Sequence, residues 1–254
     1  MSEQDGTVGA VENSYRILDI VAESDGVTLT EIAERVDLST TSVHNHLRTL
    51  VDQGAVRKDG DRYRAGFRCL TVGGPVRDEH PLYENARQAV DHLYSTTGEL
   101  SLILTEHRGK SLVLYRREGQ DSVSLDMHLG TRQHLHATAG GKAMLAHFDP
   151  EDVQSVVDRH GLPARNGNTI TDESELREEL AVVRDRGYAL DREERINGVR
   201  GVAAPIRHRE DDRVFGAIAV LGPVTRVTGD RFTDEIPELV TRNAETIEVD
   251  ITYS

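Results

Sequence analysis

The sequence predicts an α+β protein in two parts, a small winged helix-turn-helix domain and a larger domain in which helices flank an antiparallel sheet. Three observations predict this division. Apolar residues recur at helical spacing up to residue 54, and a short basic segment with a hairpin dipeptide follows. Beyond residue 99, stretches with an apolar period of two are separated by stretches with a helical period. A chain of 254 residues also exceeds the usual single-domain size.

Composition indicates the setting in which the chain works. The net charge is −14, and the only lysines are Lys58, Lys110 and Lys142. Such an acidic, lysine-poor surface suits a salt-rich cytoplasm, as in a halophilic archaeon, and it repels nucleic acid overall. The single cysteine, Cys69, excludes an internal disulfide. No basic segment precedes an apolar run at the N-terminus and no stretch approaches ~18 apolar residues, so we expect a cytoplasmic protein without a membrane partner.

Residues 29–48, LTEIAERVDLSTTSVHNHLR, carry the pattern of a helix-turn-helix. A first helix is expected to start near Thr28 and Glu31, and a second near Ser39, with a turn of three or four residues between them. Residues 9–22 predict a preceding helix that stops at the Ser24-Asp25-Gly26 sequence. These elements together predict a three-helix unit that places its last helix in a DNA groove.

The polar face of that last helix predicts contact with DNA bases. Asn45 can bind adenine and Arg48 can bind guanine through two hydrogen bonds each, and Ser or Thr can bond to bases or phosphates. In so acidic a chain a face nearly free of carboxylates is informative, although an ordinary solvated helix face would look similar. The predicted base-contacting residues are Thr40, Thr41, Ser42, His44, Asn45 and Arg48.

A two-stranded wing is predicted at residues 55–66, around the hairpin dipeptide Asp59-Gly60. Residues 39–68 contain six basic and three acidic residues, so this segment carries +3 and the rest of the chain −17. Such a local reversal of sign predicts a phosphate-binding face, although arginines that only balance acids of the same domain would give the same count. The predicted phosphate-contacting residues are Arg57, Lys58, Arg62 and Arg64.

Four segments, in the same order, resemble the IclR family of transcription regulators. They are 63–73 (YRAGFRCLTVG), 135–143 (LHATAGGKA), 187–194 (GYALDREE) and 198–205 (GVRGVAAP). The resemblance covers about residues 9–250. It implies a regulator of double-stranded DNA operators with a GAF-like effector-binding domain, assembled as a homodimer or dimer of dimers. Two-fold symmetry also suits operator half-sites about one DNA turn apart.

We therefore expect a winged domain at residues 8–70, with the helix-turn-helix at 29–48 and the wing at 55–66. A linker helix region at 71–97 and an effector-binding domain at 98–254 follow. The linker helix is expected at 83–97, with Ala86, Val90, Leu93 and Tyr94 facing inward. Strands are expected at 100–105, 111–116, 123–127, 188–191, 202–208 and 214–221, and further helices at 140–147, 150–160, 172–186 and 230–249.

The resemblance implies an effector pocket formed by Ala139, Gly140, Asp191, Gly201, Ala219 and Leu221. Small residues that lead into a helix leave backbone amides free to bind a carboxylate, which supports Ala139 and Gly140. Close packing of a helix on a sheet would also require small residues there. The following GGK sequence is not a phosphate loop, because His136 stands where the Walker pattern needs a glycine, and no cofactor is expected.

Two departures from the family pattern bear on the ligand. Gly201 stands where the family commonly has Cys, and Ala219 and Leu221 lack the hydroxyls that the last strand can carry. A pocket without these donors is larger and more apolar, so we expect an organic, sugar or aromatic acid rather than a very small oxo-acid. Asn45 stands where many relatives carry Arg, so the operator sequences of those relatives do not transfer to this chain.

Two other functions stay open at the level of sequence. His134 and His136 would share a strand face if their segment were extended, which makes them candidates for a metal pair and allows a metal-dependent enzyme domain fused to a winged helix. A DNA-binding protein without a ligand is the other alternative. The chain has no nucleophile elbow, HExxH or CxxC motif. We therefore expect no catalytic residues and predict a DNA-binding regulator controlled by a small effector.

Overall fold

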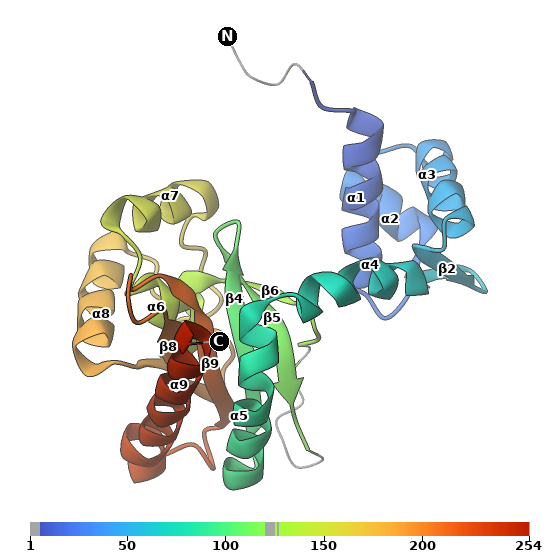
Figure 1. Ribbon diagram of the computed structural model, residues 1–254. Helices are drawn as coiled ribbons and strands as arrows, with labels where there is room; N and C mark the ends of the chain where they lie inside the picture. Colours follow the sequence, from blue (N-terminus) through green and yellow to red (C-terminus); the bar gives the residue numbers. More distant parts are fainter. Residues whose placement is uncertain (1–5, 120–124, 126, 254) are drawn as a thin grey trace. The chain divides into compact units, whose positions relative to one another are not determined.

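The computed structural model describes residues 6–119, 125 and 127–253, and the chain forms two compact units that meet in sequence at Asp78 and Glu79 (Figure 1). Over its described residues, 6–78, the N-terminal unit combines four helices with a small sheet of strand order β1-β3-β2, in which both pairs are antiparallel. Its elements are α1 (Gly9–Ala22), β1 (Val27–Thr28), α2 (Leu29–Val36), α3 (Thr40–Asp52), β2 (Val56–Asp59), β3 (Arg62–Ala65) and α4 (Phe67–Asp78).

Local sequence signals place the helices of this unit. The Thr28 side chain accepts a hydrogen bond from the Glu31 backbone while the Glu31 carboxylate accepts one from the Thr28 backbone, which starts α2 as a capping box. Asp37 ends α2 in a left-handed conformation with φ of 55°, and Ser39 caps α3. The predicted helices and the wing are thus confirmed as structural elements. Their apolar faces meet in one core formed by Ile17, Val21, Val27, Ile32, Ala33, Val36, Val43, Leu47, Val56 and Tyr63.

The C-terminal unit is built on a six-stranded sheet of order β6-β5-β4-β9-β8-β7, and every neighbouring pair is antiparallel. The elements before the second half of the sheet are α5 (Pro81–Thr97), β4 (Leu100–His107), β5 (Lys110–Arg117), β6 (Arg132–His134), η1 (Leu135–Ala137), α6 (Ala139–Leu145), α7 (Pro150–His160) and α8 (Glu173–Arg186). The remaining elements are β7 (Ala189–Arg192), β8 (Val199–Arg207), β9 (Val214–Pro223), η2 (Arg231–Glu235) and α9 (Ile236–Tyr253).

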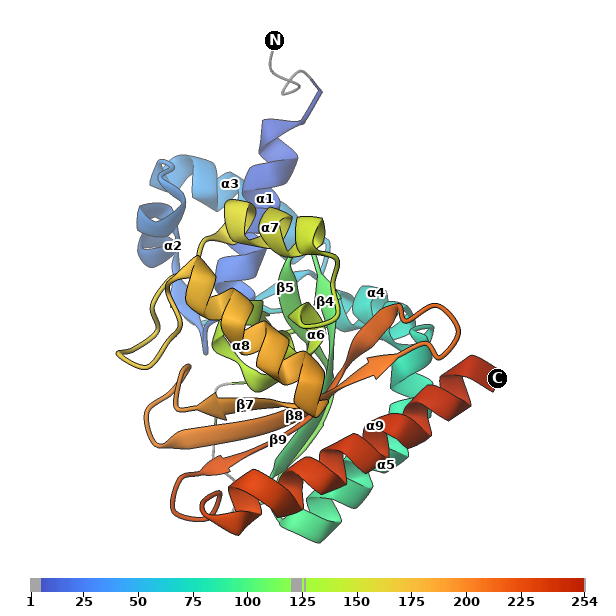
Figure 2. The same ribbon diagram turned by 90° about the vertical axis from the view of Figure 1, so that its left-hand side faces the viewer.

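Helices cover both faces of this sheet. Helices α5 and α9 pack on one face, and α6, α7 and α8 pack on the other (Figures 1 and 2). Each face of the sheet packs against its helices in a separate hydrophobic core. Successive side chains of β8 enter alternate cores: Val202 and Ala204 face α5 and α9, whereas Ala203 faces α6. The predicted antiparallel sheet flanked by helices is confirmed.

The segment expected to be a linker with one helix contains two. Helix α4 begins at Phe67, and it was not predicted because Gly73, Gly74 and Pro75 are poor helix formers. Helix α5 is part of the core of the C-terminal unit: Leu82, Ala86, Val90 and Leu93 are fully buried. The predicted strand at 123–127 lies mostly outside the described residues. The strand at the edge beside β5 is β6, which was not predicted. In the part of the chain that the structure covers, no helix is long and apolar enough to cross a membrane.

Candidate nucleic-acid interface and effector site

Helix α3 turns its predicted polar face outward. Ser42 is half-buried and the other five predicted residues are exposed. On the opposite side, Val43 and Leu47 are completely buried in the core, so packing fixes which face of the helix points to solvent. Among the residues that the structure describes, the side chains of Asn45 and Arg48 have no hydrogen-bond or ion-pair partner. Their donors are free for an external acceptor.

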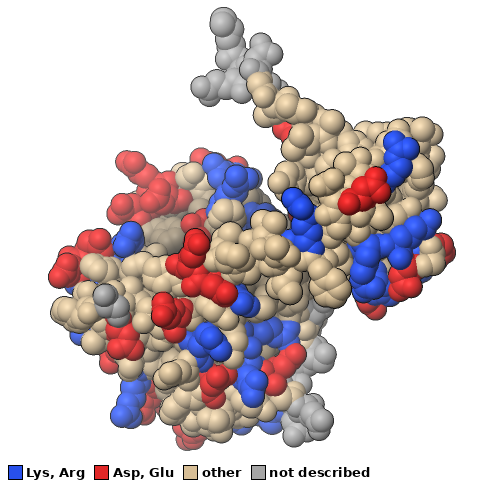
Figure 3. All heavy atoms as spheres, turned by 45° about the vertical axis from the view of Figure 1, so that its right-hand side comes forward, with Lys and Arg blue, Asp and Glu red and all other residues tan. Residues whose placement is uncertain are grey.

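The wing divides the predicted phosphate contacts between its two faces. Register pairs Arg57 with Arg64 and Asp59 with Arg62 across the hairpin, so strand alternation places these three arginines on one face. Lys58 is paired with Tyr63 on the other face, and its Nζ lies 5.7 Å from the centre of the tyrosine ring. In Figure 3 basic side chains gather at the wing end of the N-terminal unit, with acidic ones among them.

The three arginines of that face differ in their partners. Arg64 is half-buried; it pairs with Asp25, and its Nε lies 3.4 Å from an Asp59 oxygen. Arg62 is exposed and donates a hydrogen bond of 2.7 Å to the Gly26 carbonyl. Arg57 is exposed and forms no ion pair with a described residue. Balance by acids of the same domain therefore accounts for Arg64, while Arg57, Arg62 and Lys58 present their charges to solvent.

Four of the six predicted effector-binding residues meet at one point. A Cβ atom added to Gly201 would lie 3.4 Å from Asp191 Cβ, 3.5 Å from Leu221 Cγ and 3.6 Å from Ala139 Cβ. Register causes this, because Asp191, Gly201 and Leu221 are directly paired across β7, β8 and β9, and α6 begins above them with Ala139. Those distances are ordinary van der Waals contacts, so neither packing nor backbone conformation requires a glycine here. Ala219 lies two residues along β9, in the same core as Ala139.

Asp191 is the polar group of this site. It is 3% exposed, and its carboxylate accepts a hydrogen bond of 2.7 Å from the Glu194 backbone. Burial, and then the negative charge of Glu194, raise the pKa of Asp191 to about 7. The Glu194 carboxylate itself receives hydrogen bonds of 2.6 and 2.7 Å from the fully buried Lys142 Nζ. Near neutral pH the Asp191 carboxyl can therefore be protonated, and its O–H can donate a hydrogen bond to the carboxylate of a ligand.

The two glycines that open α6 are explained by packing. A Cβ on Gly140 would lie 2.5 Å from a Leu104 methyl group, and one on Gly141 would lie 2.1 Å from the Leu135 carbonyl oxygen. The Gly141 amide already donates to the Thr138 hydroxyl at 3.1 Å. The alternative of close helix–sheet packing thus accounts for both glycines, and a ligand contact of Gly140 stays a prediction.

The premise of the metal pair is wrong. His134 ends β6, but His136 lies in the helical turn η1, so the two do not share a strand face. Their rings contact edge-to-face with centroids 5.6 Å apart, and His136 Nε2 lies 3.3 Å from the Pro163 carbonyl oxygen. The described residues include no group of three or more His, Cys, Asp or Glu side chains arranged to hold a metal ion.

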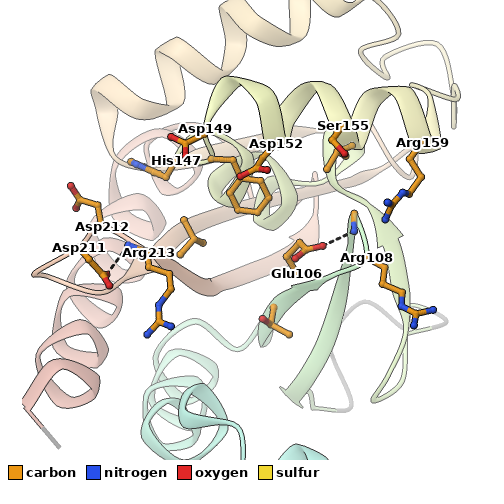
Figure 4. A pocket seen from close by; sticks show the side chains of 15 residues that line it. Glu106, Arg108, His147, Asp149, Asp152, Ser155, Arg159, Asp211, Asp212 and Arg213 are labelled. Carbon is orange, nitrogen blue, oxygen red and sulfur yellow. Dashed lines mark hydrogen bonds between the residues drawn. The ribbon is translucent and has the colours of Figure 1, made fainter.

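A cavity of about 750 Å³ lies away from the predicted residues, between the β4–β5 and β8–β9 turns and helix α7 (Figure 4). Its charged lining is mixed. Glu106 accepts a hydrogen bond from the Gly109 backbone, and Asp211 accepts one from the Arg213 backbone. No sequence motif indicates this cavity, because its lining comes from turns far apart in the chain.

Comparisons with known proteins agree with this architecture. The family described as "Bacterial transcriptional regulator IclR C-terminal" matches residues 75–249, and the "IclR helix-turn-helix domain" matches residues 10–60. The chain is 35% identical over 246 residues to the probable HTH-type transcriptional regulator ArcR of Halobacterium salinarum, covering 95% of this chain and 93% of that protein. That relative fits the predicted salt-rich setting. The chain is also 31% identical over 236 residues to the transcriptional repressor IclR of Escherichia coli, covering 90% of this chain and 85% of that protein.

Solved structures show the same fold over nearly the whole chain. The IclR transcriptional regulator of Alicyclobacillus acidocaldarius superposes with a TM-score of 0.81 at 25% identity, covering 97% of this chain and 99% of that one. An IclR homologue of Microbacterium hydrocarbonoxydans, complexed with 4-hydroxybenzoate, superposes with a TM-score of 0.79 at 23% identity, covering 96% and 100%. With a DNA-binding helix-turn-helix and a C-terminal ligand-binding domain in one chain, this protein belongs to the IclR family of transcriptional regulators and is not an enzyme.

Proposed function

We propose that this regulator binds a double-stranded DNA operator through α3 and the wing, and that a small organic or sugar acid in the C-terminal unit controls the binding. The observation that carries the proposal is that Asn45 and Arg48 face outward and their side chains bond to no other described residue, on a helix whose opposite face is packed in the core. In this assignment Thr40, Thr41, Ser42 and His44 share base contacts with them, and Arg57, Lys58 and Arg62 contact phosphates. Because its partner is the genome, we place the protein in the cytoplasm.

A DNA-binding titration tests the α3 assignment. Each of Asn45→Ala and Arg48→Ala should cost about 1–3 kcal/mol of affinity for the operator, and little for scrambled DNA, because base contacts carry sequence discrimination. Fluorescence anisotropy at one fixed salt concentration measures both affinities. The matched control is Arg35→Ala on the neighbouring helix α2, an exposed arginine outside the proposed interface. Equal losses for operator and scrambled DNA would contradict base readout by α3.

We further infer that the protein is a homodimer, alone or as part of a dimer of dimers, and that α4 supplies its contact. None of the residues of α4 is buried, and the helix contains the unfavourable sequence Gly73-Gly74-Pro75, so its own unit gives it little stabilisation. An exposed apolar surface of this kind is typical of a protein interface. Its large apolar residues are Phe67, Leu70, Val72 and Val76, which are 84, 65, 61 and 68% exposed.

Light scattering coupled to size exclusion tests the dimer. Phe67→Ser with Val76→Ser should shift the protein towards a monomer and weaken operator binding, since two half-sites then no longer act together. Leu129→Ser, at an exposed apolar residue of the other unit, is the control. A dimer that persists in the double variant would place the interface elsewhere.

For the effector, the meeting of Ala139, Asp191, Gly201 and Leu221 supports an acid. Gly201 lies directly beside Asp191, whose protonated carboxyl can donate a hydrogen bond to a ligand carboxylate near neutral pH. The homologue complexed with 4-hydroxybenzoate indicates that the fold accommodates an aromatic acid. An effector can act only through unequal affinity for two arrangements of the dimer. Operator binding titrated with and without candidate acids tests the coupling, and unchanged affinity for every acid that binds the protein would refute it.

A further inference from the structure

A smaller cavity of about 260 Å³ adjoins the candidate effector site along two chain segments. Thr138, in its lining, directly precedes Ala139, and Arg195, also in its lining, directly follows Glu194, the residue that bonds to Asp191 and Lys142. The remaining lining includes the whole of strand β6. The residues of the cavity that matter here are Arg132, Gln133, His134, Thr138, Arg165 and Arg195.

The charge of this cavity is the reverse of that of the chain. Every described charged side chain in its lining is basic, whereas the chain as a whole carries −14. The 750 Å³ cavity, by contrast, includes five carboxylate residues in its lining. Arg132 and Arg165 are exposed and form no ion pair with any described residue. Within a molecule this acidic, unpaired arginines gathered at one cavity form a site of positive potential.

A buried donor without a partner lies in the same lining. Gln133 is 7% exposed, and its Nε2 has no hydrogen-bond partner among the described residues. The backbone that carries this side chain is fixed, because β6 pairs Gln133 with Ser111 and the Ser111 hydroxyl donates to the backbone carbonyl oxygen of Gln133 at 3.5 Å. A buried amide left without an acceptor costs free energy, so such groups are rare unless a ligand or water completes them.

The neighbouring His134 has a pKa that is lowered by burial and by the same positive potential. Its Nδ1 is also buried without a described partner. Burial, and then the positive charges of Lys110 and Arg165, lower the pKa of His134 to about 4. The positive charges that lower this pKa also favour an anion beside Arg132 and Arg165.

We propose that Arg132, Gln133 and Arg165 form an anion subsite that holds a carboxylate or phosphate group of the effector. This inference rests on the proposed function, in which the effector lies beside Asp191 and Gly201. Guanidinium groups bind both kinds of anion through two parallel hydrogen bonds, and the Gln133 amide supplies a further donor. The volume is below the roughly 300–1,000 Å³ of sites for drug-sized ligands. The effector therefore carries a compact anionic group at this end.

Isothermal titration of the full-length protein with inorganic phosphate and with citrate, at one fixed KCl concentration, tests the subsite and distinguishes phosphate from carboxylate recognition. Glycerol serves as the uncharged probe and should not bind. Arg132→Gln with Arg165→Gln should weaken binding of the preferred anion at least about 10-fold. The matched control is Arg108→Gln with Arg159→Gln, which removes two exposed arginines from the 750 Å³ cavity and should leave binding unchanged.

Gln133→Leu gives a second readout that a purely structural role would not produce. Removing an unpaired buried donor should raise the melting temperature of the free protein, while the further rise caused by the anion should disappear. Anion affinity unchanged in the Arg132/Arg165 variant, or absence of binding by both probes, would overturn the subsite. Operator binding is measured separately: if it fails, the proposed function falls, whereas loss of anion binding alone leaves the DNA-binding function standing.

Discussion

The exposed cations of the N-terminal unit and the buried ion pair of the C-terminal unit use charge in opposite ways. In the N-terminal unit, Arg48, Arg57 and Lys58 are exposed and have no ion-pair partner among the described residues. In the C-terminal unit, Lys142 and Glu194 form an ion pair whose side chains are 0% and 6% exposed. Exposed cations with free donors suit a polyanionic partner. Buried pairs contribute little net stability, because desolvation offsets their attraction, but they fix the geometry around Asp191. The three cations of the N-terminal unit are left for a partner, whereas the Lys142–Glu194 pair shapes the interior of the C-terminal unit.

The largest effect is expected from removing Lys142, the buried cation of this pair. In Lys142→Met the Glu194 carboxylate would stay buried without its counter-ion, so we expect a loss of about 3–5 kcal/mol in the free energy of unfolding. Urea unfolding at fixed salt measures the loss. Lys58→Met, at an exposed lysine of the wing, is the matched control and should change stability by less than about 0.5 kcal/mol.

A double variant separates the lost pair from a general packing defect. Lys142→Met with Glu194→Gln removes both charges, so part of the lost stability should return. If Lys142→Met alone costs less than about 1 kcal/mol, as expected of a surface pair, the contrast between the two units does not hold.

The pH dependence of stability sharpens the same contrast. The pKa of Asp191 is raised to about 7 by burial and by Glu194, so the folded state binds this proton more tightly than the unfolded state does. Its contribution is fully present below pH about 4 and is lost as pH rises to about 7. The difference in unfolding free energy between the wild type and Asp191→Asn should fall by up to about 1.4 kcal/mol per pH unit in that window and then level off.

Asp211→Asn is the control for that profile. Asp211 is exposed, and a hydrogen bond from the Arg213 backbone lowers its pKa, so its replacement should produce no decline in this direction. A flat difference profile for Asp191→Asn between pH 4 and 7 would mean that Asp191 stays ionised in the folded protein, and the hydrogen-bond donor assigned to the effector site would be lost.

Elements with local signals were predictable from sequence. The Thr28–Glu31 capping box starts α2, and Pro150 and Gly161 bound α7, which was predicted with its observed ends. The three-residue strand β6 carries no local signal, because its pairing with β5 defines it. Helix α4 was missed because Gly73-Gly74-Pro75 argues against a helix.

In the candidate sites, too, contacts between residues far apart in the chain could not be predicted from sequence. The polar face of α3 follows from helical spacing alone. The meeting of Asp191, Gly201 and Leu221 depends on pairing across three strands, so only the family resemblance could point to it. The Lys142–Glu194 pair joins residues 52 positions apart in the chain. Asp25, the ion-pair partner of Arg64, lies 39 positions before it. Neither contact has a signature in sequence, which is why Arg64 was grouped with the free cations of the wing.

The smallest effect is expected from replacing either Arg57 or Arg64, which are paired across the hairpin of the wing. Arg57 has no ion-pair partner among the described residues, so Arg57→Gln should reduce the slope of log affinity against log salt by about 0.9 and weaken operator and scrambled DNA alike. Arg64 is paired with Asp25 and Asp59. Arg64→Gln should therefore leave that slope unchanged and lower the urea midpoint slightly.

Anisotropy titrations over a salt series measure both slopes, with Arg35→Gln on α2 as the control outside the wing. If Arg64→Gln reduces the slope as much as Arg57→Gln, then Asp25 and Asp59 release Arg64 to a phosphate when DNA binds. The N-terminal unit would in that case hold Arg64 in reserve for DNA. If only Arg57→Gln changes the slope, the same face of the wing carries one arginine kept for a partner and one used in an internal ion pair.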